Sequence, residues 1–267
     1  GVNLAAYFEM DTGVGQMGRG SALALGAAEV PFVRVHLDQE PSAKLAAGRI
    51  HHEEGAPHAV TLIHANADET PRALSLLPLS AASYRIGYWF WELSHFPLAF
   101  ADRFERLDEI WAPTRFCQAS FEPIATIPVR HVPPCVPCPD APAADRARFG
   151  LAADSFVFLL AFDVASIPER KNPFAAIEAF RRMVPRAGRP VSLLIKISRA
   201  NQNPELVARL SAAAKGLPIR FHTAAATRAE MDSLVAMCDA NLSVHRSEGL
   251  GLLPIEFLYL GKPVVST

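Results

Sequence analysis

The residues with the clearest chemical potential lie near the end of the chain, in the run HRSEGLGLLPIEF, residues 245–257. Glu248 and Glu256 stand on either side of a glycine-containing loop that leads into an apolar helix, with Pro254 in its first turn, where proline is tolerated. We expect Glu256 in that first turn, where it could accept hydrogen bonds from a vicinal diol, and Glu248 on the lip of the loop, facing a cleft. Backbone amides at such a helix start can bind a phosphate or a sugar hydroxyl. The amides belong to Gly249, Leu250, Gly251 and Leu252.

A purely structural explanation of the two glutamates stays open beside the chemical one. Carboxylates near a helix N-terminus interact favourably with the helix dipole, whether or not a ligand binds there. The strand ANLSVH that precedes the loop and the helix that follows it favour the binding interpretation.

A second glycine-rich run, DTGVGQMGRG, follows the first expected strand. Gly13, Gly15 and Gly18 have the G-x-G-x-x-G spacing of dinucleotide-binding loops, and Arg19 adds a positive charge. We expect a loop here and a helix from about residue 21. The spacing alone is a weak signal, and Asp38 is poorly placed to bind a ribose. An NAD-dependent oxidoreductase that uses these glycines is therefore kept as an alternative function.

The cysteines and histidines give weaker signals. Cys135 and Cys138 form a C-x-x-C pair, but prolines surround them, and a structural zinc site needs a second pair. The run HHEEGAPH, residues 51–58, lacks the spacing of a helical zinc motif and is expected to be a solvated loop. The chain has no D-x-D motif, so we expect no metal site.

Composition limits the classes of protein. The chain has 267 residues, half of them hydrophobic, with a formal net charge of −1, which argues against a nucleic-acid partner. The longest apolar run, FVFLLAF, is much shorter than the roughly 20 residues that span a bilayer. Four cysteines indicate a reducing compartment rather than a disulfide scaffold. We expect a cytoplasmic protein and a fragment that is open at both ends.

Strand-like runs alternate with helical segments along the chain, which predicts an α/β protein with parallel sheets covered on both faces. A proline-dense run at residues 133–145 interrupts this alternation. We therefore predict two Rossmann-like domains, residues 1–136 and 137–267, that face a cleft, the second of them truncated. The expected strands are 2–8, 31–37, 59–65, 84–90, 108–112, 127–132, 155–162, 190–197, 218–222, 239–244 and 263–267, and the main helices of the second domain are 172–184, 204–215, 227–237 and 253–260.

The motifs resemble a known family. HRSEGLGLLPIEFLYLGKPVVST is similar to the donor-site motif of retaining family 4 (group 1) glycosyltransferases of the GT-B type, and PERKNPFAAIEAF is similar to their basic segment. YRIGYWFWELSHFP and DEIWAPTRF resemble a bacterial polysaccharide-assembly branch. The resemblance extends over nearly the whole chain. It implies metal-independent transfer of a sugar from a nucleotide-sugar donor to a glycan or lipid-linked acceptor, with retention of configuration and no cofactor.

The resemblance also implies roles for residues. Lys171 matches the lysine that binds the diphosphate, and Arg170 substitutes for the arginine of a Gly-Arg pair that many relatives carry directly after the strand, where this chain reads Phe162-Asp163-Val164. Glu256 would bind the ribose hydroxyls, Glu248 the transferred sugar, and the loop amides sugar or phosphate. Gly13 and Gly15 would let the backbone approach the donor. A non-catalytic protein that binds sugar nucleotides is the remaining alternative.

The acceptor side is specified by fewer residues. Trp89, Trp91, Glu92 and His95 lie at or after the end of an expected strand, and His64 ends another. Aromatic rings could stack on a sugar, and Glu92 or His95 could orient an acceptor hydroxyl. Core packing explains the tryptophans equally well. Peripheral contact with the inner face of a membrane is an open option.

Overall fold

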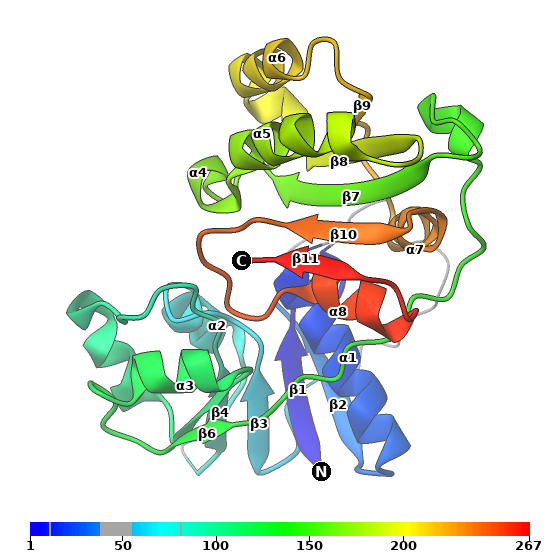
Figure 1. Cartoon of the computed structure of the whole chain (residues 1–267). Coiled ribbons are helices and arrows are strands. Elements are labelled where there is room, and N and C mark those ends of the chain that lie inside the picture. The colour runs from blue at the N-terminus through cyan, green and yellow to red at the C-terminus, as the bar shows by residue number, and fades with distance from the viewer. Residues whose placement is uncertain (11, 38–54, 81) are drawn as a thin grey trace. The chain divides into compact units, whose positions relative to one another are not determined.

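The computed structural model describes residues 1–10, 12–37, 55–80 and 82–267 (Figure 1). Asp38 and most of the histidine-rich run at residues 51–58 lie outside the described residues. The chain divides into two compact units. The first comprises Gly1–Pro137 with Glu248–Leu250, and the second comprises Cys138–Ser247 with Gly251–Thr267. Each unit is an α/β layer structure built on its own parallel sheet.

The first unit is built on a parallel sheet in which six strands are described, in the order β2-β1-β3-β4-β5-β6. The four interior strands carry buried residues and the two outer described strands carry none, as expected for a sheet covered on both faces. Its elements are β1 Val2–Ala6, α1 Gly13–Ala27, β2 Phe32–His36, β3 Val60–Ile63, α2 Thr70–Leu76, β4 Tyr84–Tyr88, the 3₁₀ segment η1 Leu98–Arg106, β5 Glu109–Ala112, α3 Arg115–Phe121 and β6 Val129–His131.

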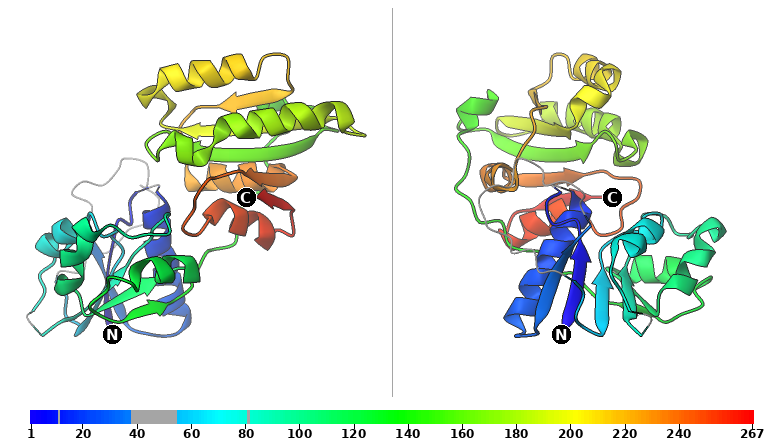
Figure 2. Two further views of the ribbon diagram at one scale, coloured as in Figure 1. Left: turned by 60° about the vertical axis from the view of Figure 1, so that its left-hand side comes forward. Right: turned by 180° about the vertical axis from the view of Figure 1, so that it is seen from behind.

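Successive residues of β1 enter two different cores, which is the period of two that a strand imposes. Leu4 packs with α1 on one face of the sheet, whereas Ala5 belongs to the core under α2, η1 and α3 on the other. Figure 2 shows these helices on the two sides of the first sheet. The second of these cores contains a cluster of aromatic rings around Trp89, in stacked, tilted and edge-to-face contacts, and the Trp89 indole nitrogen donates to the Thr70 hydroxyl (3.0 Å). The core-packing explanation of Trp89 is therefore confirmed.

The second unit is built on a parallel sheet with five described strands in the order β11-β10-β7-β8-β9. All of its strands begin and end within two residues of the predicted positions. Its elements are η2 Arg146–Phe149, β7 Phe156–Asp163, α4 Pro168–Lys171, α5 Pro173–Met183, η3 Val184–Arg186, β8 Val191–Ser198, η4 Ala200–Gln202, α6 Pro204–Ala213, β9 Ile219–His222, α7 Arg228–Met237, β10 Ala240–Ser243, α8 Leu252–Tyr259 and β11 Val264–Ser266.

Helices cover both faces of the second sheet. In Figure 1, α5 and α6 lie on one side of the strands and α7 and α8 on the other, and each pair contributes to its own buried core. The helix starts follow local sequence rules. Pro173 and Pro204 open α5 and α6, and α7 begins with a capping box in which Thr227 and Glu230 exchange hydrogen bonds. The carboxyl ends of these strands form the edge at which ligands of such sheets bind.

Candidate functional site at the carboxyl edge of the second sheet

Arg170 joins two loops at the carboxyl edge of the second sheet. It lies in the short helix α4, which follows β7. Its guanidinium donates to the carbonyl of Ser247 (3.0 Å) and to the hydroxyl of Ser166 (2.7 Å), and its own carbonyl accepts from the amide of Arg246 (2.8 Å). The predicted basic pair Arg170 and Lys171 therefore stands beside the loop that leads from β10 to Glu248.

The turn that carries this basic pair is held in an unusual backbone conformation. Ile167, directly before α4, has φ 47°, and Asn172, directly after it, has φ 53°. A branched side chain such as that of Ile167 rarely adopts positive φ, and departures of this kind concentrate at functional sites. Contacts with the surrounding structure must therefore hold the backbone around Lys171 in this conformation.

Glu256 forms a buried ion pair that sequence reasoning did not predict. Its side chain is 2% exposed, and its Oε1 lies 2.9 Å from Nη1 of Arg228, which also contacts Asp232. Burial alone would lower the pKa of the Arg228 guanidinium. The carboxylates of Asp232 and Glu256 have the larger combined effect, so the pKa of Arg228 is raised. The sequence signal for Arg228 is its place in the first turn after the capping box of α7, at the same carboxyl edge.

The loop before α8 differs in detail from the prediction. Gly251 has φ 79°, a conformation that glycine adopts without strain, and the helix begins at Leu252. Glu256 therefore lies in the second turn rather than the first, which corrects the expectation, whereas Pro254 is in the first turn as predicted. Gly249 and its two neighbours, Glu248 and Leu250, group with the first unit, in which the hydroxyl of Thr114 donates to the Gly249 carbonyl (3.0 Å).

Asp163 has a partner at the end of the neighbouring strand. The carboxylate of Asp163 accepts from Nε of Arg199 (2.9 Å). Hydrogen bonding to Asp163 raises the pKa of Arg199. The pair places a guanidinium at the end of β8, so Arg199 is a further basic residue at this edge that the motif comparison missed.

The glycine-rich run at the start of the first unit is the beginning of a helix rather than a loop, and Gly15 and Gly18 pack against the chain, whereas the donor-binding role of Gly13 and Gly15 stays a prediction. The helix begins at Gly13, because the Thr12 side chain accepts from the amide of Gly15 (3.3 Å) and caps it. A Cβ at Gly15 would lie 2.3 Å from the carbonyl oxygen of Met10, and one at Gly18 would lie 2.4 Å from the Cβ of Ala6. The chain's own atoms fill the space at Gly15 and Gly18, and only Gly13 is exposed.

Arg19 also has a structural partner. Its guanidinium donates to the carbonyl oxygens of Phe8 (2.7 Å) and Met10 (3.1 Å), which holds the turn between β1 and α1. Together with the buried glycines, this arrangement gives no support to the dinucleotide-binding alternative.

The four residues predicted on the acceptor side have different environments. Trp91 is half-buried, donates from its indole nitrogen to the His95 carbonyl (2.9 Å) and packs on Phe96 and Phe100. Glu92 is half-buried and His95 is exposed. These residues stay candidates, and they lie together in the segment after β4.

His64 is a buried structural residue, contrary to the prediction. Its ring is fully buried, and Nε2 lies 2.9 Å from the hydroxyl of Ser21 on α1. Burial lowers its pKa to about 3, so the imidazole is neutral near pH 7. Because α1 covers the end of β3, His64 has no surface to offer an acceptor.

The cysteines and other metal-ligand types are dispersed. Cys135 and Cys138 are free and exposed, and Cys117 and Cys238 are free and buried. Within residues 1–10, 12–37, 55–80 and 82–267, no group of three or more His, Cys, Asp or Glu side chains is arranged to hold a metal ion. In the same ranges, no helix is long and apolar enough to cross a membrane.

Two parallel-sheet α/β units of this kind define the GT-B fold, and solved GT-B glycosyltransferases are similar to this chain over 99% of its length. A glycosyltransferase from Rickettsia africae ESF-5 matches with a TM-score of 0.66 at 11% identity, and the match covers 78% of that chain. Sucrose-phosphate synthase from Thermosynechococcus elongatus matches with a TM-score of 0.66 at 14% identity and 80% coverage. WaaG, a glycosyltransferase involved in lipopolysaccharide biosynthesis, matches with a TM-score of 0.59 at 13% identity and 80% coverage. No family model and no curated protein sequence matches the chain.

Proposed function

We propose that the protein is a glycosyltransferase that moves a sugar from a nucleotide-sugar donor to a glycan or lipid-linked acceptor, with retention of configuration and without a metal. The observation that carries the proposal is the basic carboxyl edge of the second sheet. There Arg170 holds the loop after β10 beside Lys171, and the buried carboxylate of Glu256 is fixed by Arg228.

The chemistry of sugar transfer needs such an edge. Negative charge grows on the departing diphosphate as its bond to the sugar breaks, and fixed cations and helix N-termini stabilise that charge. Lys171 and Arg170 would contact the diphosphate. The amides at the start of α8 would add hydrogen bonds, and the Glu256 carboxylate, pre-oriented by Arg228, would accept hydrogen bonds from the ribose. Glu248 would contact the transferred sugar.

Measurements of nucleotide affinity and of turnover distinguish the proposed role of Lys171 in binding the diphosphate from that of Glu248 in contacting the sugar. UDP, GDP and ADP, and the corresponding glucose donors, serve as the first probes of nucleotide binding and hydrolysis. Lys171→Gln should weaken binding of the preferred nucleoside diphosphate about tenfold or more, because a charged hydrogen bond contributes about 1.5–3 kcal/mol. Lys215→Gln, at an exposed site after α6, is the matched control and should bind as the parent protein does.

Glu248→Ala should lower turnover more than it lowers nucleotide affinity, because its carboxylate would contact the sugar, whose charge and ring shape change during transfer. The anomeric configuration of the first product formed, read by NMR, reports retention or inversion. Nucleotide affinity without any transfer or hydrolysis would favour the non-catalytic binding alternative. If Lys171→Gln and Glu248→Ala both keep the nucleotide affinity and the turnover of the parent protein, the proposed site is refuted.

A further inference from the structure

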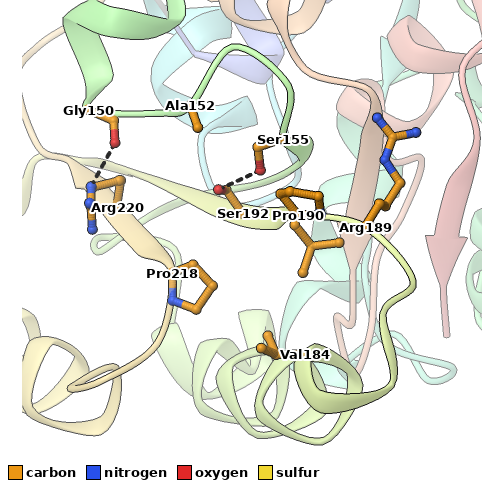
Figure 3. A pocket seen from close by; sticks show the side chains of 10 residues that line it. Gly150, Ala152, Ser155, Val184, Arg189, Pro190, Ser192, Pro218 and Arg220 are labelled. Atoms are coloured by element: carbon orange, nitrogen blue, oxygen red, sulfur yellow. Dashed lines mark hydrogen bonds between the residues drawn. The ribbon is translucent and has the colours of Figure 1, made fainter.

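The second unit contains a cavity that the proposed transfer reaction does not use. It has a volume of about 410 Å³, and it lies at the amino ends of β7, β8 and β9, at the edge opposite the carboxyl ends (Figure 3). Ser155, Pro190 and Pro218, which directly precede these strands, form its walls. Pockets for small ligands commonly measure about 300–1,000 Å³, so this cavity can hold a molecule of sugar size.

A pair of buried hydroxyls lies in this cavity wall. Ser155 is 2% exposed and Ser192 is 8% exposed, and their Oγ atoms are 2.8 Å apart, as the dashed line in Figure 3 marks. Each hydroxyl carries one proton, and the bond between them uses one of the two. Among the described residues, no other side-chain or backbone acceptor forms a hydrogen bond with either hydroxyl. The second proton of the pair can therefore be donated to a ligand in the cavity.

Two arginines, Arg220 and Arg189, line opposite sides of the cavity and make it positively charged. Arg220 donates from Nε to the Gly150 carbonyl (3.0 Å) and from Nη1 to the Ile219 carbonyl (3.2 Å), which fixes the guanidinium and leaves further N–H groups for a ligand. Arg189 lies on the other side of Pro190 with its guanidinium over the Phe156 ring. Among the described residues that line the cavity, none is acidic.

We propose that this cavity is a binding site for a small phosphate monoester of sugar size. The phosphate would accept from the Arg220 guanidinium and from the spare hydroxyl proton, since phosphate oxygens suit a fixed guanidinium. Pro190 and Pro218 would pack against the carbon skeleton. The distance along the strands from the carboxyl edge makes this site separate from the proposed donor site within the same unit.

Calorimetric titration of the intact protein with glucose 6-phosphate tests the proposal, with glucose and inorganic phosphate as the two partial probes. We expect glucose 6-phosphate to bind with a dissociation constant in the micromolar to millimolar range. Inorganic phosphate should bind more weakly, and glucose should not bind. Arg220→Gln should weaken binding about tenfold or more, and Ser192→Ala should weaken it by a smaller factor. Arg182→Gln, at an exposed arginine of α5 that does not line the cavity, is the control and should bind as the parent does.

Melting temperature establishes that each variant is folded, and if Arg220→Gln does not fold, Ser192→Ala and Arg189→Gln carry the test. Lys171→Gln should bind glucose 6-phosphate as the parent protein does, because it lies at the opposite edge. If glucose 6-phosphate at about 10 mM, a concentration above the expected range of dissociation constants, gives no binding signal, the proposal is overturned. Equal binding by the folded cavity variants, or loss of binding in Lys171→Gln, also overturns it.

Discussion

Nη1 of Arg228 and Oε1 of Glu256 lie 2.9 Å apart, and this ion pair connects the first turn of α7 to the second turn of α8. The carboxylate is almost fully buried, so its charge depends on the guanidinium that neutralises it. The pair therefore has a structural role as well as the proposed role in ribose binding, and the two can be measured separately.

Removing one partner of this pair should destabilise the fold. We expect Arg228→Gln to lower the free energy of unfolding by about 3 kcal/mol, because it leaves a buried carboxylate without its cation. The double variant Arg228→Met with Glu256→Leu should recover part of this loss, because the most deeply buried carboxylate is removed together with its cation, whereas Asp232 still loses its partner. If Glu256 binds ribose, that stable double variant should still bind nucleotide about ten- to a hundredfold more weakly. Unchanged affinity in the folded double variant would restrict Glu256 to a structural role.

Two glycines of α1 should respond in opposite directions to the same substitution. Gly18→Ala places a Cβ 2.4 Å from that of Ala6, so helix and strand must move apart, and we expect a loss of about 1–3 kcal/mol of stability. Gly26 lies in the same helix, and a Cβ added there would have nothing within 4 Å, so Gly26→Ala should gain about 0.5–1 kcal/mol. Urea unfolding measures both. Equal effects of the two substitutions would contradict the packing role of Gly18.

His64 should make the protein sensitive to acid. Its pKa is about 3 in the folded protein, against about 6.5 in an unfolded chain, so the unfolded state binds more protons between these values. Stability from this group is complete above pH 6.5 and falls as the pH falls, by about 2 kcal/mol at pH 5. His64→Gln should abolish this part of the acid sensitivity, whereas the exposed His95→Gln should keep it. Identical pH profiles for the parent and His64→Gln would disprove the assignment.

Lys262 should stabilise the end of α7. Its ammonium donates to the carbonyl oxygens of Val235 (2.8 Å), Ala236 (2.6 Å) and Cys238 (2.7 Å), which the helix leaves without intrahelical partners. Lys262→Met should lower the free energy of unfolding by about 2 kcal/mol or more, because charged hydrogen bonds are lost. The exposed Lys215→Met should change it by less than about 0.5 kcal/mol. A similar small change at both sites would show that the cap contributes little.

The strand positions were predictable because buried parallel strands form short apolar runs separated by helical segments, as at residues 156–163 and 191–198. The start of α1 was not, because three closely spaced glycines suggest a loop until Tyr7 is known to lie against Gly15 and Ala6 against Gly18. The environment of His64 depends on Ser21, and that of Glu256 on Arg228. Both partners lie far away along the chain, and local sequence does not reveal such pairs.

The positive φ of Ile167 has a consequence for local unfolding. A branched residue held at φ 47° raises the energy of the folded turn by about 1–3 kcal/mol, and opening the turn releases that energy. The amide of Arg170, which donates to the Ile167 carbonyl (3.0 Å), should therefore exchange its hydrogen with solvent faster than the amides of neighbouring β7. We expect the segment that carries Lys171 to open and reclose while the hydrogen bonds of the neighbouring sheet stay intact.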